Sequence, residues 1–529
     1  MIILQNITYS HPNKNLLFEG LNLSINKQNK IALIGNNGSG KSSLLKIIAG
    51  EIHPSAGLVR TSSCPYYVPQ LFGQFNELTI AQALKIDDKL EALHEILAGK
   101  VTDLNMALLN DDWSIEERCH QALQYWHLEG FDLAQKMKTL SGGQKTKVFL
   151  AGISIHQPEI ILLDEPSNHL DKAGRQLLYQ FIQSSASTLV VVSHDRKLLN
   201  LLDVVYELDK QGITIYGGNY GFYTDQKRIE NNALQQELKN TEKALRKARE
   251  VARESADRQQ KLDARGKKKK EKEGLPTISM NTFKNNAEKS TSRIKSVHEE
   301  KVDGISQSLN DIRAALPETD KMKFGFDNAT LHNGKILFTA KDINFSYGKH
   351  LLWKSPLNFQ ILSGERIELS GLNGSGKTTL IKIILGELEP IQGSVYRAEN
   401  NAVYIDQDYS LINNQLNVYE QAEQFNQYAF QEHEIKTRLN RFLFTKEFWD
   451  KPCGSLSGGE KMRLMLCCLT IGNKAPDIII LDEPTNNLDI QNIEILTAAI
   501  TEYMGTLIVI SHDQYFLEKI NVRRTIDLK

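Results

Sequence analysis

The sequence predicts an α/β fold in two similar halves joined by a long helical hairpin, and three observations support this prediction. A glycine-rich motif occurs twice, as GNNGSGKS at 35–42 and as GLNGSGKT at 371–378. The short motifs that follow it recur in the same order in both halves. Between the halves, apolar residues recur at helical spacing along two charged stretches. We therefore expect two domains of one fold and a separate helical element between them.

The chain has 529 residues, enough for about three or four domains at roughly 150 residues each. Hydrophobic residues make up 41% and charged residues 24%, and no apolar run approaches the roughly 18 residues that a membrane helix needs. The amino terminus, MIILQ, reads directly into a strand, so we expect a cytosolic protein. Five cysteines without CxxC spacing predict reduced structural thiols rather than a disulfide framework or a zinc site.

Each glycine-rich motif lies between a predicted apolar strand, at 30–34 or 366–369, and an amphipathic run, at 44–48 or 380–385. In this context the glycines let backbone N–H groups and a helix N-terminus face a β-phosphate. Lys41 and Lys377 are expected to contact the β- and γ-phosphates. Ser42 and Thr378 are expected to bind Mg²⁺. The predicted phosphate-binding residues are Gly35, Asn36, Asn37, Gly38, Ser39, Gly40, Lys41, Ser42, Ser43, Gly371, Leu372, Asn373, Gly374, Ser375, Gly376, Lys377, Thr378 and Thr379.

Two predicted strands, at 66–70 and 402–407, each end in a glutamine, 29 or 30 residues after the lysine of the motif. We expect the amides of Gln70 and Gln407 to reach Mg²⁺ and the attacking water.

The next motifs are TLSGGQ at 139–144 and SLSGGE at 455–460. In each, a serine and two glycines begin a helix and form a second anion site. This site is able to hold a γ-phosphate that is bound in a different glycine-rich loop. The residues predicted there are Ser141, Gly142, Gly143, Gln144, Ser457, Gly458, Gly459 and Glu460.

Apolar strands at 159–164 and 477–482 each end in an aspartate that a glutamate follows. Neighbouring residues at a strand end face differently, so Asp164 and Asp482 can hold Mg²⁺ through water while Glu165 and Glu483 orient the nucleophilic water. A solvated turn is the alternative, and the apolar residues before each pair disfavour it.

Leu-Asp pairs follow at 170–171 and 488–489, and His194 and His512 each come 30 residues after the aspartate. A histidine after a strand is usually structural. These two lie where an imidazole could hydrogen-bond the γ-phosphate. For adenine stacking, His11 or Tyr9 in the first half and Tyr347 in the second are candidates, with packing of each aromatic on a strand as the equal alternative.

The complete order of motifs resembles the ATP-binding cassette ATPases, twice, over about 1–220 and 338–529. Two cassettes without a membrane segment look like the ABC-F class of ribosome-associated translation factors, and LDEPSNHLD, LDEPTNNLD and YGGNYGFY are similar to phrases of that class. The resemblance implies two P-loop NTPase domains joined by a helical hairpin, and an ATP hydrolase that uses ATP and Mg²⁺. It also implies a monomer whose cassettes pair head to tail, with Lys41 opposite Ser457 and Lys377 opposite Ser141.

We predict cassettes at 1–225 and 338–529 and a linker at 226–320. A short helical insertion is expected near 81–125, because 71 residues separate Gln70 from Ser141 but only 50 separate Gln407 from Ser457. ABC-F proteins commonly carry a ribosome-contacting arm there. A longer helical hairpin without a binding role is the alternative.

The linker has a net charge of +7 over residues 226–273, which leaves −8 for the rest of the chain. A helix over 226–264, about 60 Å long, and a second helix are expected to pair in antiparallel, with a break at Gly266, Gly274 and Pro276. Their predicted seams are Leu234, Leu238, Thr241, Leu245, Ala248 and Ala252, and Val302, Ile305, Leu309, Ile312 and Leu316.

The basic tip of this hairpin predicts contact with RNA phosphates rather than bases, although a lysine run is more often only a solvated surface. In the ABC-F class the linker points toward the tRNA in the ribosomal P site, so rRNA and this tRNA are the expected partners. The predicted RNA-binding residues are Arg265, Lys267, Lys268, Lys269, Lys270 and Lys272.

The favoured interpretation is a twin-cassette ATPase that binds the ribosome in its closed, ATP-bound state. The sequence alone does not separate a general translation factor from an antibiotic-resistance protein. One alternative is the ATPase subunit of a transporter, which usually lacks a basic insert between cassettes. Another is a nucleic-acid maintenance ATPase that binds branched DNA. Some ABC-F relatives have that role through a C-terminal coiled coil, and here only a short segment follows His512.

Overall fold

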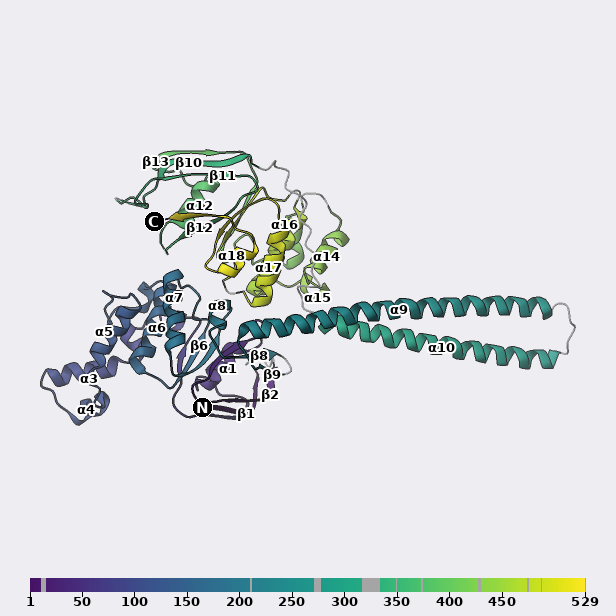
Figure 1. Cartoon of the computed structure of the whole chain (residues 1–529), viewed down its shortest axis with the longest axis horizontal. Helices are drawn as coiled ribbons and strands as arrows, with labels where there is room; N and C mark the ends of the chain where they lie inside the picture. The colour runs from purple at the N-terminus through teal and green to yellow at the C-terminus, as the bar shows by residue number, and fades with distance from the viewer. Residues whose placement is uncertain are drawn as a thin grey trace. The chain divides into compact units, whose positions relative to one another are not determined.

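A computed structural model gives the fold of the chain, and it describes residues 1–10, 16–209, 212–270, 277–315, 334–348, 350–372, 374–426, 430–472, 475–486 and 488–528. The chain divides into two compact units. The first unit contains Met1–Tyr223 and Met322–Lys529, and the second is Thr224–Lys321. The predicted fold class is confirmed: two α/β cassettes are joined by a long helical hairpin (Figure 1). The predicted domain boundaries stay predictions.

The first half is built on a six-stranded sheet of order β5-β6-β7-β3-β8-β9, in which only β9 runs antiparallel to its neighbour. The three central strands are apolar except for one residue at an end of each, which is typical of a parallel sheet covered on both faces. The strands are β3 (Lys30–Ile34), β5 (Tyr66–Val68), β6 (Ile160–Asp164), β7 (Thr188–Val192), β8 (Val204–Asp209) and β9 (Gly212–Tyr216).

A smaller antiparallel sheet of order β2-β1-β4 packs with this first half. Its strands are β1 (Ile2–Ser10), β2 (Leu16–Ile25) and β4 (Ala56–Thr61). Helix α1 (Lys41–Ile48) contributes Leu44, Leu45, Ile47 and Ile48 to one hydrophobic core together with β1, β2, β3, β6 and β7. The start of α1, where the glycine-rich loop ends, is therefore held by that core.

A second core on the other side of the six-stranded sheet holds the remaining helices of the first half. These helices are α2 (Ile80–Leu84), α3 (Asp87–Leu97), α4 (Asp103–Leu109), α5 (Ile115–Tyr125), α6 (Gly142–His156), α7 (Lys172–Ser184) and α8 (Arg196–Leu199). The segment predicted as a helical insertion is helical, and within it α3 and α4 pack against each other.

The second half repeats this plan with a parallel sheet of order β14-β15-β16-β12-β17 and an antiparallel sheet of order β11-β10-β13. The strands are β10 (Ile336–Asn344), β11 (Leu357–Leu362), β12 (Arg366–Gly371), β13 (Gln392–Arg397), β14 (Ala402–Ile405), β15 (Ile478–Asp482), β16 (Thr506–Ile510) and β17 (Arg524–Leu528). The helices are α12 (Lys377–Leu385), α13 (Val418–Gln424), α14 (Glu432–Arg441), α15 (Lys446–Trp449), α16 (Gly458–Ile471), α17 (Ile490–Glu502) and α18 (Gln514–Lys519).

The second compact unit contains most of α9 (Tyr220–Lys270) and all of α10 (Thr277–Ala315), which form a hairpin and run side by side (Figure 1). The predicted apolar seam is visible in the burial pattern, since Leu245 and Leu309 are buried and the other described seam positions are half-buried. Arg313 forms an ion pair with Glu242 across the two arms at 2.9 Å, so these two positions face each other in the hairpin. The seam residue Leu316 lies outside the described residues.

The predicted break at Gly266 is wrong, because α9 continues through this glycine to Lys270. A glycine inside a helix costs only about 1 kcal/mol relative to alanine, and the lysines around it are good helix formers. Gly274 and Pro276 lie outside the described residues. The helix is thus longer than expected, about 77 Å at 1.5 Å per residue.

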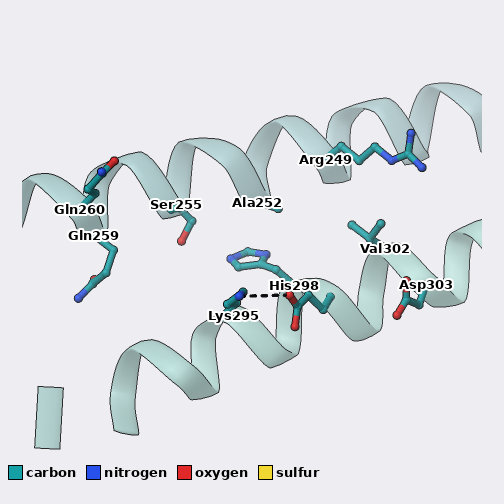
Figure 2. A pocket seen from close by; sticks show the side chains of 11 residues that line it. Arg249, Ala252, Ser255, Gln259, Gln260, Lys295, His298, Val302 and Asp303 are labelled. Carbon is teal, nitrogen blue, oxygen red and sulfur yellow. Dashed lines mark ion pairs between the residues drawn. The ribbon is translucent and has the colours of Figure 1, made fainter. Parts of the chain in front are cut away.

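A cavity of about 480 Å³ lies between the arms, where small residues on α9 face α10 (Figure 2). Ala252 and Ser255 come from α9, and His298 and Val302 come from α10. Figure 2 shows the imidazole of His298 lying between the two helices. The seam is therefore filled by Leu245 and Leu309 near the Glu242–Arg313 ion pair and incompletely filled further along the arms.

No helix in the described part of the chain is both long enough and apolar enough to cross a membrane.

Candidate functional site

The glycine-rich loop of the first half lies between β3 and α1, as its sequence context predicts. Gly40 caps α1 with φ of 95°, and a Cβ on Gly35 would collide with the backbone oxygen of Leu208, so both positions need glycine. The ammonium of Lys41 donates to the carbonyl oxygens of Gly35 and Asn36 at 2.7 and 3.1 Å. Lys41 is only 7% exposed. The loop thus holds a buried cation whose acceptors phosphate oxygens can replace.

The loop of the second half lies between β12 and α12 and repeats this arrangement. Gly376 caps α12 with φ of 91°. The ammonium of Lys377 donates to the carbonyl oxygens of Gly371 and Leu372 at 2.8 and 3.2 Å. Lys377 is half-buried. Asn373, a predicted loop residue, lies outside the described residues.

The paired carboxylates stand at the ends of two equivalent strands, with Asp164 closing β6 and Asp482 closing β15. The glutamates that follow, Glu165 and Glu483, adopt the left-handed conformation with φ of 50° and 48°. The N–H of each donates at 2.8 Å to the carbonyl of the last residue of the next strand, β7 or β16. This backbone turn, rare for a residue with a Cβ, directs aspartate and glutamate differently, as the sequence predicts.

Each glutamate contacts the histidine that was predicted to sense the γ-phosphate. His194 Nε2 lies 3.2 Å from Glu165 Oε1, and His512 Nε2 lies 3.2 Å from Glu483 Oε1. In the first half the backbone N–H of His194 also donates to Glu165 Oε2 at 3.3 Å. Both halves therefore place a carboxyl group and an imidazole together beside the glycine-rich loop.

Burial sets the charge of these pairs. Loss of hydration raises the pKa of Glu165 to about 8 and that of Glu483 to about 7, with the neighbouring aspartates adding to the increase. Burial lowers the pKa of His194 to about 3 and that of His512 to about 4. The imidazoles are thus neutral at physiological pH. A carboxyl group with a pKa near neutrality is suited to exchanging a proton there.

Two tyrosines near the aspartates were not predicted as site residues. Tyr67 on β5 donates its hydroxyl to Asp164 Oδ2 at 3.1 Å, and Tyr404 on β14 donates to Asp482 Oδ2 at 2.9 Å. Burial raises the pKa of both aspartates, and these hydroxyl groups, with that of Ser42 beside Asp164, oppose the increase. The available signal was the recurrence of a tyrosine three residues before each glutamine.

The prediction that these two strands end at Gln70 and Gln407 is wrong. Strand β5 ends at Val68 and β14 ends at Ile405, two residues earlier in each case. Gln70 is half-buried and Gln407 is exposed. Pro69 has no N–H for a strand ladder, which explains the early end of β5. Both glutamines lie on loops next to the aspartate-bearing strands, and their contact with Mg²⁺ stays a prediction.

The signature serines cap two helices. Ser141 Oγ accepts from the N–H of Gln144, and Ser457 Oγ accepts from the N–H of Glu460, both at 3.3 Å. The side chains of Gln144 and Glu460 accept in return from the serine N–H groups at 2.8 and 2.7 Å. These capping boxes explain the last residue of each signature, a local role that the anion-site prediction missed. Both serines are exposed at the helix N-terminus.

The aromatic candidates differ in exposure. Tyr347 is 72% exposed and its hydroxyl hydrogen-bonds Thr379 Oγ1 at 3.0 Å, so this ring lies beside the second glycine-rich loop. Tyr9 is buried in the core against Phe18, as the packing alternative predicts. His11 lies outside the described residues.

Hydrogen bonds also join the two halves inside the first compact unit. The backbone N–H of Asn37, in the first glycine-rich loop, donates to Asp489 Oδ2 at 3.0 Å. Arg196 Nη2 donates to Glu494 Oε1 at 3.0 Å. Asp489 is 5% exposed and caps α17. The repeated Leu-Asp pair was the sequence signal for this residue, although no role was predicted for it.

Unsatisfied polar atoms around the loops fit a nucleotide and a divalent cation. The hydroxyl oxygens of Ser39 and Ser375 and the carboxylate Oε2 of Glu483 are buried without a hydrogen-bond partner among the described residues. Buried polar atoms without partners are costly and indicate a missing ligand or solvent. Hydroxyl and carboxylate oxygens are also the donor set that Mg²⁺ prefers.

Five of the six predicted RNA-binding residues lie near the C-terminal end of α9. Arg265 is exposed. The residues 267–270 belong to α9, and their side chains are not described. Lys272 lies outside the described residues, so the RNA contact stays a prediction.

The fold and the two sites together define a twin-cassette ATPase. The chain matches the ABC transporter family over residues 18–168 and 355–486. It is 31% identical to the putative ATP-binding protein YdiF of Bacillus subtilis over 532 residues, which span 96% of this chain and 77% of the relative. It is 30% identical to the ribosome protection protein VmlR of the same organism, spanning 98% of this chain and 85% of the relative.

The chain also resembles ABC transporter F family member 5 of Arabidopsis thaliana, with 28% identity over 99% of this chain and 74% of the relative. Among solved structures, the complex of archaeal ribosomal stalk protein aP1 and archaeal ribosome recycling factor aABCE1 matches with a TM-score of 0.61 at 20% identity. That match covers 98% of this chain and 86% of the other, and it shows the fold. The protein belongs to the ABC transporter family of ATP-binding cassette proteins and, within it, to the ABC-F class. It is an ATP hydrolase.

Proposed function

We propose that this protein is a ribosome-associated ATPase that acts on translation through its hairpin. The observation that carries the proposal is a hairpin that forms a separate unit, comes between the two cassettes in the sequence and has a basic end on α9. ATP hydrolysis by two cassettes does not require the two hairpin helices of 51 and 39 residues. The likeness to a relative named as a ribosome protection protein supports the same conclusion.

In each site the lysine of the glycine-rich loop binds the β- and γ-phosphates of ATP. Ser42 with Asp164, and Thr378 with Asp482, hold Mg²⁺, which when bound neutralises phosphate charge. Gln70 completes the first of these sets of Mg²⁺ ligands, and Gln407 completes the second. Glu165 and Glu483 orient the attacking water and exchange its proton.

The sites are composite, and each ATP lies between a lysine of one half and a signature serine of the other. The pairs are Lys41 with Ser457 and Lys377 with Ser141. The hydrogen bond from Asn37 to Asp489 supports this arrangement, because it joins the first glycine-rich loop to the second cassette. A single chain then suffices, and the protein acts as a monomer in the cytosol.

ATP closes the cassettes and holds the hairpin in the pose that binds the ribosome, and hydrolysis releases it. The basic end of α9 contacts phosphates of rRNA and of the P-site tRNA through charge and shape.

Co-sedimentation with ribosomes tests this function. The Glu165→Gln/Glu483→Gln protein with ATP should pellet with ribosomes, and the same protein with ADP should stay in the supernatant. Branched DNA at the same phosphate concentration as the ribosomes serves as competitor. Loss of ribosome binding to that DNA at equal phosphate concentration would show that the protein acts on DNA instead.

Antibiotic protection is the more specific candidate role, and the likeness to VmlR favours it. Expression in a susceptible bacterial host should raise the minimal inhibitory concentration of drugs that bind near the P-site tRNA. Equal drug sensitivity together with ribosome binding would assign the protein to general translation.

A further inference from the structure

The two tyrosines that contact the aspartates occupy equivalent places in the two parallel sheets. Tyr67 pairs with Leu162 across β5 and β6, and Tyr404 pairs with Ile480 across β14 and β15. The aspartate lies two residues further along the partner strand in each case. Because side chains alternate along a strand, a tyrosine and a residue two positions beyond its pair share one face of the sheet. The hydroxyl therefore reaches the carboxylate diagonally.

Each of these hydroxyl groups is a permanent donor. An ordinary phenol has a pKa of about 10 and therefore carries its hydrogen at neutral pH. The phenol stays protonated at physiological pH, and its one hydrogen is directed at carboxylate Oδ2. A hydrogen bond to a charged acceptor is about twice as strong as a neutral one. The bond fixes the rotation of the carboxylate.

The neighbouring tyrosine shows that this placement is specific. Tyr66 precedes Tyr67 on β5 and points to the opposite face, where its hydroxyl donates to the carbonyl oxygen of Phe149 at 3.0 Å. Tyr66 is therefore part of the helical core. Only the second tyrosine belongs to the nucleotide site.

We infer that Tyr67 and Tyr404 are positioning residues that orient the Mg²⁺-binding aspartates for the bound nucleotide. With Oδ2 held by the phenol, the remaining oxygen of each aspartate can be directed toward the cation. In the first half the hydroxyl of Ser42, the other predicted cation ligand, lies beside the carboxylate of Asp164. Partners that hold metal ligands in place commonly change metal affinity by about 10- to 100-fold when they are removed.

This inference rests on the proposed role of Asp164 and Asp482 as cation ligands, so the test separates the two. The full-length Tyr67→Phe/Tyr404→Phe protein keeps both rings and loses both hydroxyl groups. Mn²⁺ affinity is measured by electron paramagnetic resonance with a non-hydrolysable ATP analogue. We expect it to fall by about 10-fold or more. Affinity for a fluorescent ATP analogue in EDTA should stay unchanged, because the phenols do not contact phosphate.

The matched control is Tyr66→Phe, which loses a buried hydroxyl of the same strand and should keep the original Mn²⁺ affinity. The reference is Asp164→Asn/Asp482→Asn. Weak Mn²⁺ binding in the aspartate variant but normal binding in the tyrosine variant would overturn the role inferred for the tyrosines and leave the proposed cation site standing. Normal Mn²⁺ binding in both would overturn the proposed cation site as well. If the double variant does not fold, the single variants Tyr67→Phe and Tyr404→Phe each report on one site with the same expected loss.

Discussion

At the residue scale, the two catalytic candidates Glu165 and Glu483 combine an unusual backbone with an unusual pKa. Both lie in the left-handed region directly after a buried strand, and both have a raised pKa because burial removes hydration. Such conformations cost of order 1–3 kcal/mol and persist where the surrounding fold imposes them. Their occurrence at the same place in two cassettes indicates a requirement of the site.

Replacing both glutamates by glutamine should abolish turnover while ATP stays bound. Glutamine keeps the shape but cannot accept a proton, so steady-state ATPase activity should fall by at least about 100-fold. Retention of labelled ATP on a desalting column measures the trapped state.

Glu159→Gln is the matched control, since this exposed glutamate precedes β6 and pairs only weakly with Lys27 at 3.7 Å. It should keep normal turnover. ATPase activity of the double variant close to that of the control would assign the water-orienting role to other groups.

The raised pKa of Glu165 predicts a pH effect on stability. A carboxyl group with a folded pKa of about 8 stabilises the folded state only while protonated, so stability falls as pH rises toward 8. His194 acts in the opposite direction, but only below pH of about 6.5, its unfolded value. Between pH 6.5 and 8, Glu165→Gln should therefore raise the melting temperature of the nucleotide-free protein increasingly with pH. Calorimetry measures the melting temperatures of the original and Glu165→Gln proteins across this pH range. A difference that does not change with pH would refute the raised pKa of Glu165.

Substitution of the lysines in the glycine-rich loops should weaken nucleotide binding. Lys41→Ala and Lys377→Ala each remove a cation that already donates to its own loop, so both ATP affinity and turnover should fall. Isothermal titration with an ATP analogue checks this. Lys27→Ala, an exposed lysine outside both sites, is the control. Unchanged affinity in both loop variants would reject the assignment of these loops.

At the element scale, local motifs could be predicted and contacts between distant strands could not. The glycine-rich loops and the Asp-Glu strand ends are short stretches whose geometry follows from their own residues. The bond from Tyr67 to Asp164 depends on the pairing of β5 with β6, which lie far apart in sequence. The same holds for Asn37 and Asp489. A single sequence carries no direct signal for such a register.

Errors at element ends have local causes. Strand β5 ends before Gln70 because Pro69 cannot continue a ladder, and this could have been read from the sequence. In the second half Asp406 lies at the same place, and its carboxylate accepts from the N–H of Ser410 at 2.7 Å in a turn. Helix α9 passes Gly266 because the good helix formers around this glycine offset its cost.

The incompletely filled part of the hairpin seam predicts a stabilising substitution. Ala252→Leu places an isobutyl group in the cavity beside Val302 and His298, and burial of that group should stabilise this part of the hairpin by about 1 kcal/mol. Slower amide hydrogen exchange over residues 248–260 is the expected readout. Val251→Leu, at an exposed position outside the seam, should leave exchange unchanged. Faster exchange in Ala252→Leu would mean that the arms are forced apart.

At the scale of the whole molecule, charge is divided between the two compact units, and the basic segment predicts a salt-dependent interaction. If about 6 phosphates are contacted, ribosome affinity should fall by roughly 10³ between 50 and 200 mM salt. Replacing Lys267, Lys268, Lys269 and Lys270 by glutamine should weaken association and flatten this dependence. Co-sedimentation across a salt series measures both effects.

Ribosome-free ATPase activity is the control for these four changes, because the lysines are distant in sequence from every nucleotide-site residue. It should be unaltered. The same salt slope in both proteins would mean that the lysines are a solvated surface and that the cassettes do the docking.

Helices α9 and α10 pair in antiparallel, so the hairpin can be shortened with its seam intact by removing equal lengths from both arms. Removing seven residues from one arm alone would carry Glu242 and Arg313 out of register, whereas removing seven from each arm at facing positions preserves the seam. Each matched step shortens the reach by about 10 Å. Paired insertions or deletions of seven residues should therefore change the length of the hairpin and keep its apolar seam.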